Sequence, residues 1–249
     1  MIRSMDTLKR SFNVIQVKQE NMSANAANVT TPGYKFQQVI QSTLESSDMV
    51  NYMNGSKLDQ RQELGSLELG NQVEGMYRHF ENGGLQQTSQ PTDIAIQGNG
   101  FFTIQTPEGL AYTRNGQFTT NDAGTLVTQE GYAVLGRNAA GVTGLIQVGN
   151  SMTVGQNGMV SDSGMQLLIT DIPNLGNLES RGDTLFVGAA GIAIDNPQVM
   201  QGYIETSNVE TADLMIEMMQ ISREFEANQK VLQASDDTLR RAVNDLGKI

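Results

Sequence analysis

The chain has 249 residues, of which 27 are acidic and 16 basic, so its net charge at neutral pH is −11. An acidic surface is repelled by nucleic-acid phosphates and by anionic lipid, which argues against a general nucleic-acid-binding protein. Cysteine is absent and His79 is the single histidine. This composition excludes disulfide frameworks, thiolate nucleophiles and any metal site that needs two imidazoles. We therefore expect neither a metal nor a cofactor.

Glycine and proline are confined to the middle of the chain. All five prolines and 25 of the 26 glycines lie between residues 32 and 202. Because both residue types interrupt helices, the two ends favour helix and the middle favours turns. No stretch reaches the roughly 20 apolar residues of a membrane-spanning helix, so we expect no membrane insertion. The first residues also lack the apolar stretch of a cleaved signal peptide.

Residues 1–31 are predicted to form a helix with one narrow apolar seam. Apolar residues recur there at alternating steps of three and four, interrupted by Gln19: Met5, Leu8, Phe12, Ile15 and Met22. This spacing is typical of helices that pair in a coiled coil, whereas a helix that lies on a domain usually has a wider apolar face.

Residues 203–249 are predicted to form a second, longer helix. Its seam is interrupted by Ser222, Gln229 and Asp236, and its apolar members are Met215, Met218, Phe225, Leu232 and Leu239. Each helix has an apolar stripe to bury, and the simplest partner for each is the other, in a coiled coil of the two chain ends. The alternative is that both helices pack on the middle domain.

The middle divides into two parts. Residues 32–76 are polar and irregular, which predicts an extended connector. Residues 77–202 hold nine short β-type runs separated by turn signals, which predicts an antiparallel β domain. Asn99-Gly100, Asn115-Gly116 and Asn157-Gly158 predict tight turns with positive φ at the glycine. The predicted fold is α+β and mainly β, with the β domain inserted between terminal helices that pair as a coiled coil.

The β domain contains no recognisable catalytic motif. Gly98-Asn99-Gly100 begins like a dinucleotide-binding loop, but Thr103 stands where the third glycine is needed and a strand follows in place of a helix. A pair of carboxylates acting as a hydrolase acid and base stays open as an alternative. His79 has no second imidazole to work with, so a structural role is expected. We predict that the chain is not an enzyme.

Three blocks of sequence stand out in order along the chain. The first runs from an Asn- and Ala-rich helix end into Thr31-Pro32-Gly33-Tyr34-Lys35, the second covers residues 84–132, and the third covers residues 202–230. Their most distinctive residues are Asn25, Asn28, Thr31, Pro32, Gly33, Tyr34, Gly98, Gly100, Phe101, Phe102, Tyr112, Thr113, Arg114, Gly116, Ser207 and Asn208. Together these blocks resemble the rod and hook proteins of the bacterial flagellum.

Several residues of these blocks have a local physical meaning. Pro32 must end the first helix and biases Thr31 toward an extended conformation, while Gly33 permits a sharp exit. Ser207 or Asn208 is placed to cap the last helix. These interpretations hold with or without the resemblance.

The resemblance implies a structural subunit of the flagellar basal-body rod, which polymerises through its terminal helices into the shaft that transmits torque from motor to hook. It also implies export through the flagellum's own apparatus, and a place in the basal body outside the cytoplasm. The implied partners are copies of the chain, other rod and hook proteins and the export apparatus, with neither nucleic acid nor membrane among them. The compact middle favours rod over hook and leaves distal and proximal rod types open. The alternative is a secreted β-rich adhesin or carbohydrate-binding module with an oligomerising coiled coil.

Overall fold

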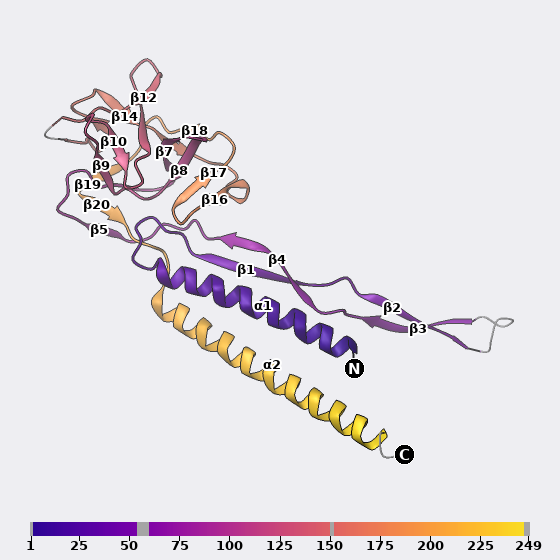
Figure 1. Ribbon diagram of the computed structural model, residues 1–249. Helices are drawn as coiled ribbons and strands as arrows, with labels where there is room; N and C mark the ends of the chain where they lie inside the picture. The colour runs from indigo at the N-terminus through magenta and orange to yellow at the C-terminus, as the bar shows by residue number, and fades with distance from the viewer. Residues whose placement is uncertain (1, 54–59, 150–151, 247–249) are drawn as a thin grey trace. The chain divides into compact units, whose positions relative to one another are not determined.

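The computed structural model describes residues 2–53, 60–149 and 152–246 (Figure 1). Residues 1 and 247–249 of the predicted helical segments, 54–59 of the predicted connector and 150–151 of the predicted β domain lie outside the described residues. The structure is α+β and mainly β, with two helices flanking an antiparallel β domain, which confirms this part of the prediction. The chain forms two compact units. The first unit comprises Met1–Ala24, Gln37–Tyr77 and Thr211–Ile249, and the second comprises Asn25–Phe36 and Arg78–Glu210.

The two helices are shorter than predicted. Helix α1 spans Ile2–Ala27 and helix α2 spans Thr211–Leu246, and neither contains a glycine or proline. α1 ends before residue 31 because turns occupy the residues that lead to Pro32, which cannot continue a helix. α2 begins at Thr211 because residues 203–205 form strand β20 (Tyr203–Glu205), which pairs with β5 (Leu85–Gln87).

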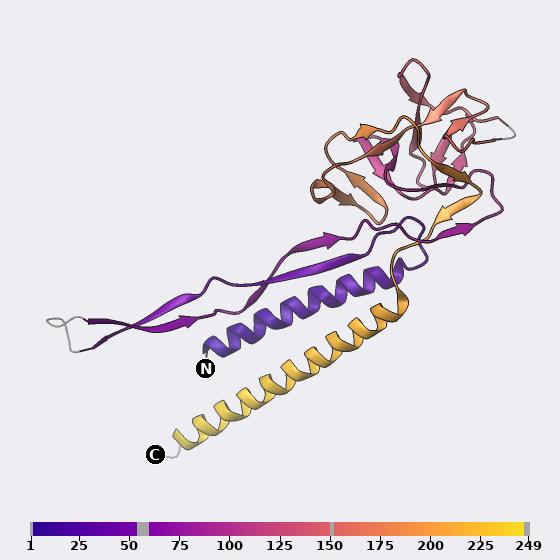
Figure 2. The ribbon, with the colours of Figure 1, turned by 180° about the vertical axis from the view of Figure 1, so that it is seen from behind.

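A two-stranded ribbon is formed by residues 37–53 and 60–77 of the first unit (Figure 2). Strand β1 (Gln37–Thr43) pairs with β4 (Asn71–Arg78), and β2 (Ser47–Met53) pairs with β3 (Gln60–Leu67). The β2–β3 register shifts between Met49 and Val50. Only an extended connector is predicted from the sequence here. The strands are extended, but their mutual pairing escaped prediction because both faces of the ribbon carry many polar residues, so no period of two stands out.

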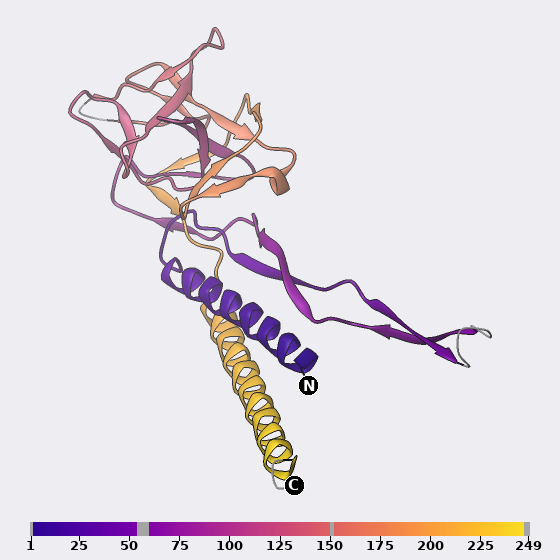
Figure 3. The ribbon, with the colours of Figure 1, turned by 45° about the vertical axis from the view of Figure 1, so that its right-hand side comes forward.

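The second unit is built of short strands (Figure 3). They are β5, β6 (Ile94–Ile96), β7 (Phe101–Thr106), β8 (Gly109–Thr113), β9 (Phe118–Thr120), β10 (Leu126–Thr128), β11 (Ala133–Arg137), β12 (Thr143–Leu145), β13 (Met159–Val160), β14 (Met165–Leu167), β15 (Ile169–Asp171), β16 (Glu179–Arg181), β17 (Leu185–Val187), β18 (Ile192–Ala193), β19 (Val199–Gln201) and β20, with a 3-10 turn, η1 (Leu175–Asn177). The central path of the largest sheet runs β13-β14-β11-β7-β8-β17-β16. β6 pairs with β19 in a separate small sheet, so the end of the unit closes against its beginning.

Two apolar clusters stabilise the second unit. Adjacent residues of β7 divide between them, because side chains alternate across a strand. Phe102 lies in the larger cluster, where its ring meets Phe118 edge-on at 5.0 Å. Phe101 lies in an aromatic cluster with Tyr112 and Phe186. The larger cluster also contains Ile94, Ile104, Leu126, Val134, Ile146, Val160, Leu167 and Ile169, all of which are buried.

Candidate functional site

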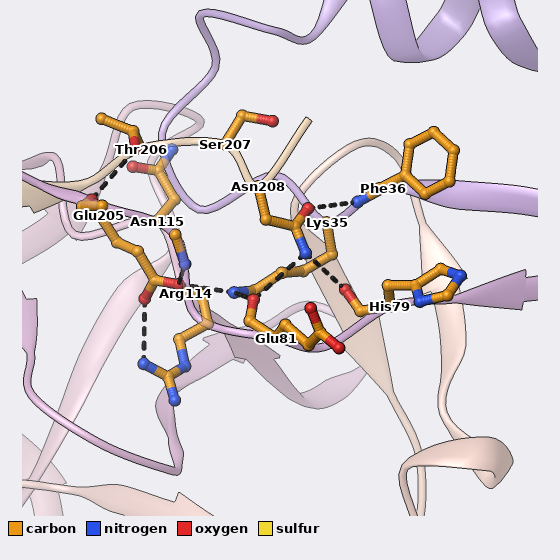
Figure 4. Close-up of polar contacts among 12 residues, drawn as sticks. Lys35, Phe36, His79, Glu81, Arg114, Asn115, Glu205, Thr206, Ser207 and Asn208 are labelled. Carbon is orange, nitrogen blue, oxygen red and sulfur yellow. Dashed lines mark hydrogen bonds and ion pairs between the residues drawn. The ribbon is translucent and has the colours of Figure 1, made fainter. Parts of the chain in front are cut away.

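Segments that are far apart in the sequence meet inside the second unit (Figure 4). They are residues 33–36, which lead into β1, residues 79–83, which follow β4, and residues 205–208, which lead into α2. The turn at residues 114–116, after β8, joins them. The three segments that join this unit to the ribbon and to α2 are therefore linked to one another within the unit.

A buried charge cluster, consisting of Lys35, Arg114 and Glu205, holds these segments together. Lys35 Nζ donates to Glu205 Oε1 at 2.5 Å, and Arg114 Nη1 donates to Glu205 Oε2 at 3.0 Å. The side chains of Lys35, Arg114 and Glu205 are 0%, 3% and 2% exposed. Two cations thus share one carboxylate out of contact with water.

Backbone groups complete the cluster. Lys35 Nζ also donates to the carbonyl of Glu81 at 2.7 Å, and Arg114 Nη2 donates to the carbonyl of Gly98 at 2.6 Å. Burial lowers the pKa of the Lys35 amine, and the charge of Glu205 opposes this shift in part. Burial likewise lowers the pKa of the Arg114 guanidinium, again against the attraction of Glu205. Because desolvated charges are costly unless paired, the cluster is stable only when all its members are in place.

Asn208 bridges the same segments with its carboxamide. Its Oδ1 accepts the backbone N–H of Phe36 at 2.7 Å, and its Nδ2 donates to the carbonyls of His79 at 2.9 Å and Glu81 at 3.2 Å. The helix-cap role expected for Ser207 or Asn208 is wrong, because α2 begins at Thr211. The polar atoms of Asn208 instead satisfy backbone groups of two other segments.

Glycines allow the segments to approach one another. Gly33 has φ +71, and a Cβ there would lie 2.3 Å from the backbone nitrogen of Asn115. Gly116 does not have the positive φ predicted for it, whereas Gly100 does, with φ +113. A Cβ on Gly116 would lie 1.7 Å from the carbonyl oxygen of Ile94. Glycine is therefore required at residue 116 because there is no room for a side chain, and not because of its backbone conformation.

The first sequence block is fixed by short-range hydrogen bonds. Tyr34 Oη donates to Asn25 Oδ1 at 2.9 Å, and Thr31 Oγ1 donates to Asn28 Oδ1 at 2.9 Å. Tyr34 and Asn25 are both buried. Burial raises the pKa of the Tyr34 phenol, and the nearby Arg78 guanidinium opposes this shift. These bonds explain why polar residues flank Pro32 on both sides.

The remaining motif residues support the sheet and its turns. Thr113 Oγ1 donates to the carbonyl of Thr184 at 2.9 Å and accepts the N–H of Asn115 at 3.0 Å. Tyr112 Oη accepts the N–H of Gly191 at 3.3 Å. Ser207 Oγ accepts the N–H of Val209 at 3.3 Å. The structure thus brings most of the motif into one connected region of the second unit.

The predicted seams lie in the first unit, and their members differ in environment. Phe12 meets Phe225 edge-on, with 5.4 Å between ring centroids, and Asn228 Nδ2 donates to Ser11 Oγ at 2.7 Å. Ile15 and Met22 are buried, Met5 and Leu8 are half-buried, and so are Leu232 and Leu239. Met215 and Met218 are exposed. The buried residues of α2 are instead Leu214 and Ile221.

Sequence reasoning missed Lys35 and Glu205 as site residues, although both lie within the quoted blocks. Charged residues are normally exposed, so neither residue stands out as buried in the sequence. Nothing in either block shows that Lys35 and Glu205, which are 170 residues apart, pair with each other. Leu214 and Ile221 were missed as seam residues of α2, because the register that contains Met215 and Met218 is just as apolar.

The described residues hold neither a metal site nor a membrane-spanning helix. Among them, no group of three or more His, Asp or Glu side chains is placed to bind a metal ion. No helix in the described part of the chain is both long and apolar enough to cross a bilayer. The ring of His79 lies 5.6 Å from that of Phe36. The geometry of the site is that of a structural connection, in which the charges of Lys35, Arg114 and Glu205 are buried against one another.

Comparison with known proteins gives consistent matches along the chain. Residues 95–162 match the model of the "Flagellar hook protein FlgE/F/G D1 domain", and residues 200–246 match that of the "Flagellar basal body rod FlgEFG protein C-terminal". The chain is 31% identical to the flagellar basal-body rod protein FlgG of Buchnera aphidicola subsp. Schizaphis graminum, over 97% of this chain and 98% of the relative. It is 31% identical to the flagellar hook-basal body complex protein FlhO of Bacillus subtilis over the full length of both. It is 29% identical to the flagellar basal-body rod protein FlgF of Caulobacter vibrioides, over 98% of this chain and 94% of the relative.

Proposed function

Because the chain belongs to the family of the flagellar basal-body rod proteins, we propose that its copies polymerise through α1 and α2 into the shaft that transmits torque from motor to hook. The chain is a structural, non-enzymatic component of the flagellar basal body, as its family is. The mechanism proposed for it is packing: apolar helix faces are buried by neighbouring subunits, and contacts that do not close produce a helical assembly.

One observation carries this proposal: α2 leaves large apolar side chains exposed along its length. Met215, Ile216, Met218 and Met219 form an exposed apolar group on its first turns, and Val231 and Val243 are exposed further along, although α2 also has buried residues. Contiguous apolar surface on a helix marks a site of interaction with another protein. The contact between Phe12 and Phe225 supports pairing of α1 and α2 as a coiled coil within each subunit.

The proposed partners are further copies of the chain and other rod and hook proteins. Methionine suits such surfaces, because its flexible thioether packs against more than one kind of neighbour. We also propose that the chain reaches the basal body through the flagellar export apparatus, as the family resemblance implies. The adhesin alternative gains no support from the comparisons.

Replacement of Phe12 or Phe225 by glutamate tests the proposal. A charge placed in the ring contact must be desolvated when the helices pack, so rods should not assemble and a cell that depends on this chain should not swim. Motility and rod formation are measured in a strain whose own gene is deleted.

Asn13→Glu is the matched control, because Asn13 is exposed on the same helix. It should leave motility unchanged. The purified Phe12→Glu chain should retain the cooperative thermal unfolding of the second unit. Normal rods and normal swimming with both Phe12→Glu and Phe225→Glu would show that the helices do not drive assembly.

A further inference from the structure

The first turns of α2 are apolar on two opposite sides. Leu214 and Ile221 are buried, whereas Met215, Ile216 and Met219 are 60%, 49% and 54% exposed. A helix that is apolar around its circumference is normally surrounded by other protein. Within a single chain, only the side with Leu214 and Ile221 has that cover.

The exposed side continues along α2 as a mainly basic stripe, on which Arg223, Lys230 and Arg241 lie together with one acidic residue, Asp237. At about 100° per residue, Ile216, Met219, Arg223 and Lys230 fall within roughly 60° of one another around the helix axis. We call these four residues the outer face of α2. Arg223 and Lys230 are exposed, and neither has an ion-pair partner among the described residues. The outer face therefore offers apolar contact followed by positive charge.

The ribbon has the complementary character. Its exposed apolar residues are Ile40, Met49, Leu64, Leu69, Met76 and Tyr77. Residues 37–77 contain six acidic and two basic side chains, and the exposed acidic ones include Glu45, Asp48, Glu68 and Glu74. Each of its two sheets has only two strands in the described residues. Such a ribbon is marginally stable alone and gains from packing against a helix.

The same chain cannot supply the cover. Both surfaces are exposed within one copy, so they do not bury each other there. The inner side of α2 is the one turned to β1, because Glu217 and Ile221 line a groove of about 300 Å³ together with Val39 and Gln41. α1 exposes no large apolar side chain over residues 5–27, where side chains are described. The outer face needs an apolar and acidic partner, and α1 is neither.

We propose that the outer face of α2 is covered by the ribbon of a second copy of this chain. Met219 and Ile216 then pack against apolar side chains of that ribbon, while Arg223 and Lys230 face its carboxylates. Two different surfaces meet in such a contact, so it is heterologous, and its repetition gives an open helical filament wherever the rotation between copies does not close a ring. The inference rests on the proposed function, because it requires that copies assemble.

The absence of cysteine allows a direct test by disulfide formation. Met219→Cys and Met76→Cys are introduced into separate chains that carry different tags, and the two are mixed and oxidised at concentrations at which the parent chain assembles. We expect the mixed disulfide to exceed the half share that random pairing would give. Asn13→Cys, on the exposed polar side of α1, replaces Met219→Cys as the control and should give no such excess.

A charge exchange tests the same contact independently. Arg223→Glu with Lys230→Glu should weaken the contact by about five- to tenfold, since exposed ion pairs contribute modestly. Glu68→Lys with Glu74→Lys in the second chain should restore it. Mixed disulfide at the random share, or no restoration by the exchanged charges, would overturn the inference.

Sedimentation of the unsubstituted chain shows whether copies assemble at all, apart from whether they do so through the contact of α2 with the ribbon. If the parent assembles but the cysteine pair gives only random disulfides, this inference fails and the proposed function stands. If the parent remains monomeric at every concentration and no mixed disulfide forms, both fail.

Discussion

Glu205 links three other segments of the second unit. Its carboxylate neutralises two buried cations, accepts the N–H of Gly83 at 3.0 Å, and its backbone carbonyl accepts the N–H of Gly33 at 2.8 Å. One residue of β20 thereby satisfies groups from three other segments. Removal of one partner from a buried ion pair is more damaging than replacement of the whole pair, because the remaining charge stays desolvated.

Glu205→Gln should therefore lower the free energy of unfolding by about 3–5 kcal/mol, measured by denaturant titration. Asp195→Asn is the control. Asp195 also pairs with an arginine, Arg137, but its side chain is 88% exposed. An exposed pair contributes at most about 1 kcal/mol, so this control should unfold almost as the parent does. Equal effects of the two substitutions would show that burial of the cluster is irrelevant.

The pH dependence of the Glu205→Gln variant follows from Lys35. Its folded-state pKa lies below the ordinary 10.5, so between these two values the unfolded chain binds more protons and stability rises with pH. Loss of the carboxylate lowers the pKa of Lys35 further and widens this window. The difference in unfolding free energy between variant and parent should thus narrow as the pH is raised toward 10.5. A constant difference would indicate that the loss does not come from the buried charge.

Gly33→Ala should destabilise the second unit for two reasons. The left-handed conformation costs about 1–3 kcal/mol for a residue with a side chain, and the added Cβ also meets the backbone of Asn115. Gly131→Ala separates the two causes, because Gly131 has φ +87 but nothing within 4 Å of an added Cβ. Thermal unfolding should show a clearly larger loss for Gly33→Ala. Similar losses of stability for Gly33→Ala and Gly131→Ala would show that the close approach of Gly33 to Asn115 contributes little to stability.

At the scale of the elements, β20 decides where the second unit ends. The sequence suggests a boundary at residue 202, after the last glycine before the helix. In the structure Tyr203–Glu205 pairs with β5, and Asn208 bonds to backbone groups that precede and follow the ribbon. Limited proteolysis of the purified chain should accordingly leave a protected fragment that retains residues 203–210. Cleavage at 202 with the remainder still folded would contradict this boundary.

Patterns within single elements predicted the elements well, and contacts between distant elements escaped prediction. Helix was predictable at both ends because glycine and proline are absent there, and the β domain because of its turn residues. Which residues of α2 are buried was not predictable. Leu214 and Met215 are equally apolar, and only the tertiary environment buries Leu214 and leaves Met215 exposed. The pairing of Lys35 with Glu205 was beyond reach for the same reason, because no local pattern links residues in separate blocks.

At the scale of the whole molecule, the two units have opposite relations to solvent. The second unit buries the charge cluster of Lys35, Arg114 and Glu205 and most of its large aromatic side chains, so its stability comes from within. The first unit leaves Met215, Ile216 and Met219 exposed, together with the apolar residues of the ribbon. A subunit built in this way has one part that is complete alone and one part that gains burial from neighbours.

The charge cluster also sets an order in time. A polypeptide is made from its N-terminus, so Lys35 and Arg114 are synthesised long before their shared carboxylate. Until residue 205 has been added, burial of those two cations is opposed by their uncompensated charge, which disfavours closure of the second unit. The electrostatics of the cluster therefore favour completion of this unit only in the last fifth of synthesis, once the carboxylate of Glu205 can pair with both cations.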